Sequence, residues 1–407
     1  MSALRRTFTP ITHPVGTAIV LLLAIAPFLR AQASFNSPRD MMIAVRQGDM
    51  AEVKALLRQD PNLAFTKFDG ISPLYWAAFY DRGEIARLLL ANHADVDTRA
   101  FNNGTPLHAA ASRGSTLIVT LLLAADAGVD ARSDLNYTPL HKAAVAGHAN
   151  VAELLLKHQA EVDAKNDNQE TPLALAAANG RADVVRVLLA NRAAVDSRGR
   201  SGGTPLQAAA RGGYADVVAV LLANKAQVDA MMDTGWTALQ MAADAGHADV
   251  IQELLEDGAQ VNFAGRVYDT PLHCASWRGR KEAAEVLLSH RADVKARGRY
   301  GRTPLHSAAE GGYKDLAELL VAHKADVNAA DNWGATPLHY AAATGHRDVA
   351  EFLVAHGASL NAKDNQGRTP LQYSARSDAL PFLVGEIPAD DKRAQVAELL
   401  RQHGAHE

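Results

Sequence analysis

The side chains that could do chemistry in this chain of 407 residues are 16 histidines and one cysteine. Five histidines recur at one position of a regular sequence repeat: His108, His141, His273, His306 and His339. Zinc holds each ligand at ~2.0–2.1 Å. Helices packed side by side lie ~8–10 Å apart, so ring nitrogens one repeat apart cannot easily share one ion. No His-Glu-x-x-His and no Cys-x-x-Cys occurs, and the sequence therefore predicts no metal site.

The cysteine, Cys274, occupies a position where other repeats have Lys142, Met241 or Tyr340. We interpret it as a semi-buried structural residue, with a reactive thiol as the alternative. Residues 199–203 are rich in glycine but resemble a phosphate-binding loop only loosely, because such a loop must follow a strand and open a helix. The sequence therefore predicts no catalytic residue and no cofactor, and an enzyme is the least favoured interpretation.

Composition limits the class of protein. Hydrophobic residues make up 48% of the chain and aromatic residues 6%, so burial is plentiful and comes mainly from Ala, Leu and Val. A chain of this length exceeds the size at which one closed core stops growing, so several domains or an elongated array are expected. The net charge of −4 gives no overall attraction to nucleic acid or anionic membranes. No nucleic-acid partner is expected, and a single cysteine excludes an intrachain disulfide.

The segment 1–33 differs from the rest. Arg5 and Arg6 precede an apolar run at 15–29, and Ala31-Gln32-Ala33 follows it. This is the three-part layout of a secretory signal peptide, with cleavage expected after Ala33. The run is short for a membrane span and contains a proline, so an uncleaved anchor is the alternative. The sequence predicts an exported protein, periplasmic or secreted, with no stable membrane anchor after cleavage.

The remaining chain repeats at a constant interval, beginning at Ser72-Pro73-Leu74. Later units open with a Thr-Pro-Leu triplet, in which Ala238 once replaces the proline; the threonines are Thr105, Thr138, Thr171, Thr204, Thr237, Thr270, Thr303, Thr336 and Thr369. Glycine recurs at the ninth position after the threonine, from Gly114 to Gly345, and Val-Asp pairs keep the same register. An earlier segment has the glycine but not the threonine, which indicates an N-terminal cap.

Thr-Pro-Leu-His followed by alanines at this interval resembles the ankyrin repeat, as in Thr105-Pro106-Leu107-His108. The resemblance covers about residues 37–407, or eleven units. It implies an all-α repeat solenoid, an ankyrin array of helix-turn-helix units joined by β-hairpin fingers. We assign residues 1–33 to a signal peptide, 34–66 to an N-terminal capping unit, 67–363 to nine repeats and 364–407 to a C-terminal capping repeat.

The repeated residues explain why each unit folds. Threonine before proline starts a helix, because its hydroxyl caps an orphan amide and proline has no amide hydrogen to leave unpaired. The glycine at the ninth position after it can take the left-handed conformation that ends this helix. A second helix follows, and each unit needs neighbours to bury both of its faces. In the family, the histidine column ties its helix to neighbouring backbone.

The last repeat is longer than the others. The interval from Thr369 to Val396 is about twice the equivalent interval from Thr336 to Val349 in the unit before it. An insertion at about 377–391 accounts for the difference. We interpret the insertion as a flap that caps the apolar end of the array, and a docking element for a partner is the alternative.

By the family resemblance, a partner binds the concave surface made by the finger tips and the inner face of the first helices. Tryptophan, tyrosine and arginine dominate binding hot spots, since each covers much area and keeps a polar group. The predicted partner-binding residues of this kind are Trp236, Arg266, Tyr268, Trp277, Arg278, Arg299, Tyr300, Arg302 and Trp333, with Phe79 and Tyr80 as a smaller second contact.

Charge supports the same region. Residues 265–302 contain nine Lys or Arg and four acidic residues, a net charge of +5 in a chain whose net charge is −4. We hypothesise that an acidic partner surface docks here. The alternative is that these are solvated tips that happen to be basic.

The sequence therefore predicts a monomeric, non-catalytic protein-protein interaction scaffold outside the cytoplasm. Two alternatives stay open. One is binding of an acidic non-protein ligand, a glycan or nucleic acid, by the Arg-rich repeats. The other is an exported effector.

Overall fold

The computed structural model divides the chain into two compact units, Met1–Asp134 and Leu135–Glu407. The structure describes residues 37–100, 102–265, 269–375 and 390–406. The predicted signal peptide at 1–33 lies outside the described residues, as does all but the end of the predicted insertion at 377–391.

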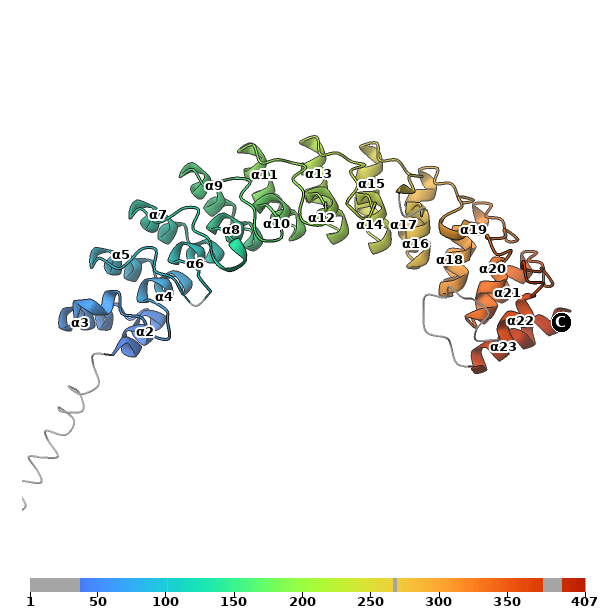
Figure 1. The fold of residues 1–407 in the computed structure, drawn as a ribbon, viewed down its shortest axis with the longest axis horizontal. Coiled ribbons are helices and arrows are strands. Elements are labelled where there is room, and N and C mark those ends of the chain that lie inside the picture. The colour runs from blue at the N-terminus through green and yellow to red at the C-terminus, as the bar shows by residue number, and fades with distance from the viewer. Residues whose placement is uncertain (1–36, 101, 266–268, 376–389, 407) are drawn as a thin grey trace, which may run out of the picture. The chain divides into compact units, whose positions relative to one another are not determined.

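Within its described residues, the first unit consists of paired helices (Figure 1). The pairs are α2 (Pro38–Gln47) with α3 (Met50–Gln59), α4 (Pro73–Phe79) with α5 (Gly83–Ala91), and α6 (Pro106–Arg113) with α7 (Thr116–Ala124). The short 3-10 turn η1 (Pro61–Ala64) follows α3. The first helix of each pair packs on the first helix of the next pair, and the second helices pack likewise.

The second unit repeats this arrangement. Its first helices are α8 (Pro139–Ala146), α10 (Pro172–Ala178), α12 (Pro205–Gly212), α14 (Ala238–Ala245), α16 (Pro271–Trp277), α18 (Pro304–Gly311), α20 (Pro337–Ala343) and α22 (Pro370–Ala375). Its second helices are α9 (Ala149–Lys157), α11 (Ala182–Ala190), α13 (Ala215–Ala223), α15 (Ala248–Glu256), α17 (Lys281–Ser289), α19 (Lys314–Ala322), α21 (Arg347–Ala355) and α23 (Asp390–Gln402). The 3-10 turns η2 (Asp134–Asn136) and η4 (Arg299–Gly301) lie in connecting turns. First helices form one layer and second helices another, and the predicted helical repeat solenoid is confirmed.

The Thr-Pro pairs begin the first helices as predicted. At α8, Thr138 has extended backbone, its hydroxyl accepts the N–H of His141 at 3.3 Å, and Pro139 takes the first helical position. Gly147 ends the helix with a φ of 91°, in the left-handed region that favours glycine. The column glycines from Gly114 to Gly345 all have positive φ.

The core of each compact unit is a series of alanine and leucine layers. In the repeat of α8 and α9, Leu140, Ala143, Ala144 and Leu155 are fully buried. Small residues on the first helices let neighbouring backbones approach closely. Because each helix pair has apolar faces toward both neighbours, stacking makes one shared core.

The histidine column, in which glutamine stands at Gln207 and Gln240, joins a repeat to the next at several places along the array. In α16, His273 Nδ1 accepts the N–H of Thr270 at 3.2 Å, and Nε2 lies 3.1 Å from the carbonyl oxygen of Arg302. Because Nδ1 accepts, Nε2 carries the proton and donates to that carbonyl. Gln240 makes the equivalent pair of backbone bonds, at 2.9 and 2.7 Å. The predicted tie between this column and neighbouring backbone is confirmed.

Two further columns of side chains join neighbouring repeats. The aspartate of each Val-Asp pair accepts a backbone N–H from the next repeat, as Asp163 does from Ala194 at 3.0 Å. The residue after the column glycine reaches back to the preceding repeat, as Arg181 Nε does to the carbonyl of Val145 at 3.1 Å. The sequence showed the first column, but its role was not predicted.

The connecting fingers are tight turns with little regular β-structure. In one finger the N–H of Gly199 donates to the carbonyl of Gly203 at 3.1 Å, and the N–H of Arg200 donates to the carbonyl of Asn168 in the preceding finger at 2.8 Å. In the described part of the chain, β-structure is represented by an isolated bridge between Phe68 and Ile71. Backbone bonds between neighbouring fingers place their tips in a row.

Alanine at position 180 should destabilise the array more than alanine at position 258. Gly180 has a φ of +67°, and an added Cβ would lie 2.6 Å from Cδ1 of Tyr214. Gly258 has a φ of +91° and nothing within 4 Å of the added atom. Backbone strain costs ~1–2 kcal/mol at both positions, and overpacking adds ~1–3 kcal/mol only at Gly180. Urea-unfolding midpoints measure the difference, and equal losses would contradict this role of the close approach.

Acid should weaken the array through its buried histidines. Burial lowers the pKa of His306 to about 3, whereas the same side chain in the unfolded chain titrates near its ordinary pKa of about 6.5. The unfolded state therefore binds more protons between these values, so the contribution of His306 is complete above about pH 6.5 and declines as the pH falls toward about 3.

The variant His306→Gln separates this titration from the hydrogen bonds, because Gln240 makes the same bonds without titrating. Its free energy of unfolding, measured from about pH 7 to about pH 4, should fall less steeply than that of the unmodified chain. Identical slopes would show that His306 is not a source of the acid sensitivity.

Candidate interaction surface

Finger tips and first helices of the second unit enclose a cavity of about 470 Å³, within the ~300–1,000 Å³ range of ligand sites. We call it the aromatic cavity. Its lining residues are Trp236, Asp244, Asp269, His273, Cys274, Trp277, Arg278, Arg299, Tyr300, Arg302 and Ser307. Six predicted partner-binding residues are therefore brought together: Trp236, Trp277, Arg278, Arg299, Tyr300 and Arg302. Arg266 and Tyr268 lie outside the described residues.

Tyr300 is held in an uncommon backbone conformation beside this cavity. Its φ is 63° and its ψ is 18°, in the left-handed region that costs a residue with a Cβ ~1–2 kcal/mol. The centroid of the Tyr300 ring lies 5.1 Å from that of Trp333. The Arg299 guanidinium lies 4.8 Å from the centroid of the Tyr300 ring. Leu135, at the equivalent position of an earlier finger, has the same backbone conformation with a φ of 58°, so this conformation belongs to the finger turn, which here presents an aromatic ring and a cation together.

The carboxylates of the aromatic cavity are already engaged by local bonds. Asp244 pairs with Arg278 at 2.8 Å, and this hydrogen bond raises the pKa of Arg278. Asp269 Oδ1 accepts the backbone N–H of Arg299 at 2.9 Å. Within the described residues, the exposed guanidinium of Arg299 has no carboxylate partner. It is available to an anionic group of a ligand.

Arg302 is buried, which corrects its expected place on the exposed surface. It is 8% exposed, and its Nη1 pairs with Glu310 at 2.7 Å. Its Nε donates to the hydroxyl of Tyr340 at 3.0 Å, and that hydroxyl donates to Asp331 at 2.6 Å. Arg302 therefore ties its finger to α18 and α20 and serves mainly as a structural wall of the cavity.

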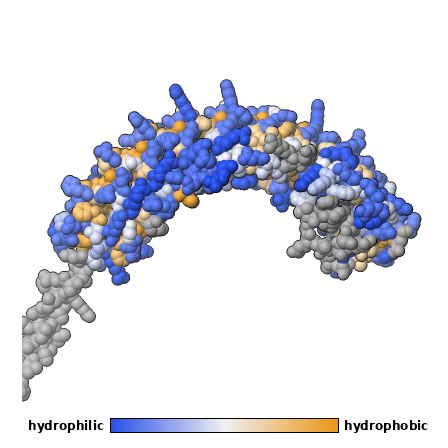
Figure 2. Space-filling view, viewed as in Figure 1, coloured by the Kyte–Doolittle hydropathy of each residue, from blue (hydrophilic) through white to orange (hydrophobic). Residues whose placement is uncertain are grey.

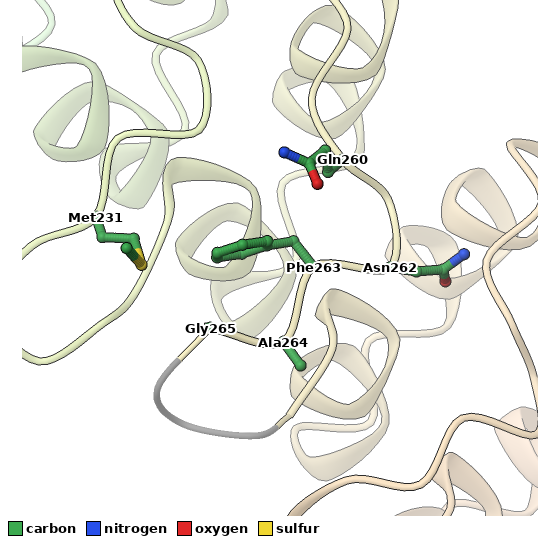
Figure 3. Close-up of a pocket in the computed structure, with 6 residues that line it drawn as sticks. All are labelled: Met231, Gln260, Asn262, Phe263, Ala264 and Gly265. Carbon is green, nitrogen blue, oxygen red and sulfur yellow. The ribbon is translucent and has the colours of Figure 1, made fainter.

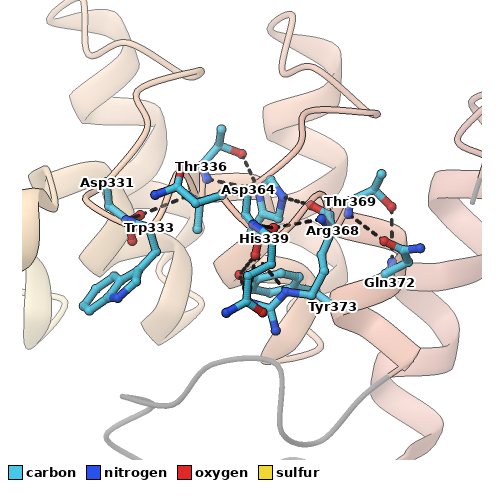
Figure 4. A network of polar contacts seen from close by, with 12 residues as sticks. Asp331, Trp333, Thr336, His339, Asp364, Arg368, Thr369, Gln372 and Tyr373 are labelled. Carbon is cyan, nitrogen blue, oxygen red and sulfur yellow. Dashed lines mark hydrogen bonds and ion pairs between the residues drawn. The ribbon is translucent and has the colours of Figure 1, made fainter.

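A related polar network occupies the last repeat, where Figure 4 shows it beside the Thr-His cap of α20. The Tyr373 hydroxyl donates to Asp364 at 2.8 Å, and Arg368 pairs with the same carboxylate at 2.7 Å. Although burial opposes ionisation of Asp364, hydrogen bonds from Arg368 and Tyr373 hold its pKa below the ordinary value. Sequence reasoning missed these networks, although Tyr and Asp recur at the same offsets from the threonine in both repeats.

Cys274 contributes a buried wall rather than a reactive group. Its side chain is 6% exposed, and burial, with a smaller effect from Asp269 and Asp244, raises the pKa of its thiol. The thiolate is the reactive form of cysteine. The structural interpretation of this residue is therefore favoured over the reactive one.

A second recess, which we call the methionine cavity, lies along the same face and measures about 360 Å³. It is lined by Asn168, Glu170, Ala174, Ala178, Gly199, Arg200, Ser201, Gly203, Thr204, Gln207, Ala208, Arg211, Met232 and Met241. Sequence reasoning did not assign this recess, because its alanines and methionines resemble ordinary packing residues.

A third cavity, of about 550 Å³, lies after α15 (Figure 3) and is lined by Met231, Gln260, Asn262, Phe263, Ala264 and Gly265. The ring of Phe263 points toward Met231. The cavity borders residues 266–268, which are outside the described residues, and its described lining holds no ionisable side chain.

In the first unit, Phe79 and Tyr80 belong to an aromatic cluster at the end of α4. The Tyr80 ring stacks on Trp76 with centroids 5.5 Å apart and meets the edge of Phe79 at 5.2 Å. Arg46 lies 5.8 Å from the Tyr80 ring, and Arg113 lies 5.7 Å from the Phe79 ring. Phe79 is 39% exposed, so the cluster has an accessible apolar edge beside two cations.

The face of the molecule seen in Figure 2 is mainly hydrophilic, with hydrophobic residues scattered over it. Large apolar side chains that are exposed in the described residues are Phe65, Phe79, Leu117, Leu135 and Met231. They are spread along the sequence rather than gathered in one segment.

Ser201 lies in the sequence Gly199-Arg200-Ser201-Gly202-Gly203, which has the Gly-x-Ser-x-Gly spacing of a hydrolase nucleophile elbow. Sequence reasoning overlooked this match. An elbow is a turn between a strand and a helix at the edge of a sheet, whereas this segment is the tip of a finger. The geometry gives Ser201 no activating surroundings.

Neither a metal centre nor a membrane span is found in the described ranges. They contain no group of three His, Cys, Asp or Glu placed to hold a metal ion. None of their helices is long and apolar enough to cross a membrane.

Models of known protein families match most of the array. A family described as ankyrin repeats (3 copies) matches residues 41–133, 107–198, 191–265 and 265–331, and one described as ankyrin repeats (many copies) matches residues 319–374. A crystal structure of the human ASB11 ankyrin repeat domain is 30% identical, with a TM-score of 0.51, and the match covers 55% of this chain and 99% of that domain. Comparison with curated proteins gives no match. The family matches end before residue 407, and the count of eleven units stays a prediction.

Substituting Arg302 should destabilise the fold, whereas substituting Arg299 should not. Arg302→Gln breaks a buried ion pair with Glu310, and removing one member of such a pair costs ~3–5 kcal/mol. Arg299→Gln changes an exposed side chain, where the effect is within about ±0.5 kcal/mol. Chemical denaturation of both variants measures the contrast. A similar loss in both would contradict the structural role assigned to Arg302.

Proposed function

Because this chain belongs to the ankyrin-repeat family, whose arrays mediate protein-protein interaction, we propose that it is a non-catalytic scaffold that holds a protein partner on the inner face of its second unit. The observation that carries the proposal is the aromatic cavity. Trp236, Trp277, Tyr300 and Arg299 all line it, a composition typical of binding hot spots.

A scaffold is favoured over an enzyme by the state of the groups that could react. The thiol of Cys274 is buried and its pKa is raised. The ring of His273 has both nitrogens engaged with backbone groups. Neither side chain is placed to attack or deprotonate a substrate.

We infer that the partner presents carboxylates to this surface. Two of the positive charges counted in residues 265–302 are paired within the protein, because Arg278 pairs with Asp244 and Arg302 pairs with Glu310. Arg299 is the cavity's exposed cation without a carboxylate partner among the described residues. A carboxylate of the partner is therefore expected to pair with the Arg299 guanidinium rather than with the segment as a whole.

We also infer that the scaffold acts outside the cytoplasm, in the periplasm or after secretion. The support is the N-terminal sequence, in which Arg5 and Arg6 precede an apolar run and Ala31-Gln32-Ala33. This order is typical of a signal peptide. The chain that works would then begin at Ser34.

Capture of a partner from the native envelope fraction tests the proposal. The chain from Ser34 is used as bait beside a Trp277→Ala/Arg299→Ala/Tyr300→Ala variant, and bound proteins are identified by mass spectrometry. A protein recovered by the unmodified chain should be reduced at least tenfold with the variant, because hot-spot residues each contribute about 2 kcal/mol or more.

The matched control is Arg186→Ala, which removes an exposed arginine from the second-helix layer, where it pairs with Asp183. This control should retain the partner. Equal recovery by the triple variant, with its thermal unfolding unchanged, would remove the aromatic cavity as the site. A non-protein ligand would be favoured if the bait binds nucleic acid or glycan in the absence of any other protein. The affinity for such a ligand should fall steeply as the salt concentration rises.

A further inference from the structure

The aromatic cavity and the methionine cavity share one repeat. Helix α14 contributes Met241 to the methionine cavity and, about one helical turn later, Asp244 to the aromatic cavity. The finger before α14 likewise contributes Met232 to one and Trp236 to the other. The two cavities are therefore consecutive recesses of one trough along the inner face of the second unit.

Each recess contains an exposed arginine without a carboxylate partner, and the methionine cavity has a further one, Arg200, whose guanidinium donates to the backbone carbonyl of Asp167 at 2.7 Å. Arg211, near the end of α12, lines the methionine cavity, and Arg299 lines the aromatic cavity. Within the described residues neither guanidinium forms an ion pair. The neighbouring acids are engaged elsewhere, since Glu170 accepts from Asn166 Nδ2 at 3.0 Å and Asp244 is held by Arg278. Each recess therefore offers positive charge to a ligand, with Arg211 and Arg299 the arginines whose guanidinium groups have no ion-pair partner and no backbone hydrogen bond in the described part of the chain.

The apolar surfaces beside the two arginines differ. Trp236 and Trp277 provide flat walls, which suit an aromatic side chain stacked on or edge-on to them. Met232 and Met241 provide flexible thioethers, which adapt to many apolar shapes. The aromatic cavity is thus the more selective recess, and the methionine cavity the more tolerant one.

The distance between the recesses indicates the form of the ligand. Arg211 lies on α12 and Arg299 lies in η4, the turn before α18, which is three repeats further along the array. At ~8–10 Å between packed helices, the two arginines are roughly 24–30 Å apart. An extended peptide rises ~3.3 Å per residue, so about seven to nine residues join them.

We propose that this trough binds an extended acidic segment of the partner protein. An aromatic side chain of the segment enters the aromatic cavity next to a carboxylate that pairs with Arg299. A second carboxylate, about seven to nine residues away, pairs with Arg211. The inference rests on the proposed function and deepens it, because it identifies a linear segment as what the scaffold recognises.

The charges of the trough favour this ligand over a polyanion. Nucleic acids and acidic glycans carry closely spaced charges, whereas Arg211 and Arg299 are about three repeats apart. Between them lies the carboxylate of Asp269, which would repel a continuous negative charge. Two separated carboxylates on a peptide avoid this acid.

Selection from random decapeptides displayed on phage tests the proposal, with the chain from Ser34 as the target. Selected peptides should contain two Asp or Glu residues separated by about seven to nine positions, with Phe, Tyr or Trp adjacent to one of them. Selection on the Trp277→Ala variant should lose the aromatic preference and keep the acidic pair.

The selected peptide, synthesised with a fluorescent label, is then titrated with the variants Arg211→Gln and Arg299→Gln. Each variant should raise the dissociation constant about tenfold, since each removes one charge-assisted hydrogen bond. The matched control Arg186→Gln removes the same charge from α11 and should leave the dissociation constant unchanged.

The proposal is overturned if no peptide is enriched, if enriched peptides lack the acidic pair, or if the two arginine variants bind the selected peptide as tightly as the unmodified chain. Equally tight binding of a single-stranded oligonucleotide at these arginines would also overturn it. Failure here can be told apart from failure of the scaffold function. A chain that still captures a folded partner through Trp277, but selects no peptide, is a scaffold that recognises a folded surface instead.

Discussion

The hydrogen bond from the third residue of a first helix to the last carbonyl of the next finger, made in α8, α12, α14, α16, α18 and α20, is the interaction on which the rest of this structure depends. His273 makes this bond to Arg302 at 3.1 Å while its other ring nitrogen caps its own helix. A helix pair cannot bury both faces alone, so the repeats must stack in a defined register. This bond sets that register and, at the same time, fixes the finger that carries Arg299 and Tyr300.

The local rules of the fold could be predicted from the sequence because they act over few residues. Threonine before proline starts a helix at Thr138, and Gly147 ends it in the left-handed conformation. The accessibility of the site residues could not be predicted in the same way. Arg302 is buried because Tyr340 and Glu310, on two other helices, receive its guanidinium. A net charge summed over a segment counts such a residue without regard to where its side chain lies.

Structural and recognition positions are separated within each repeat. The histidine, aspartate and glycine columns are occupied by backbone contacts, and their geometry leaves them little freedom to serve a ligand. The finger tips and the inner positions of the first helices are less constrained, so they can carry Trp277 in one repeat and Met241 in another. Tyr300 shows the cost of this freedom, since its left-handed φ of 63° is retained where glycine would be unstrained.

Amide hydrogen exchange of the full chain, compared with His273→Ala and His273→Gln, tests most directly whether the capping bond positions the finger that bears the site. The amides of Gly298, Gly301 and Asn332 are hydrogen-bonded within or beside that finger. We expect them to exchange faster in His273→Ala, glutamine to restore their protection as Gln240 does in its own repeat, and α17 to be unaffected. Unchanged exchange of these three amides in His273→Ala would contradict the positioning role of the capping bond.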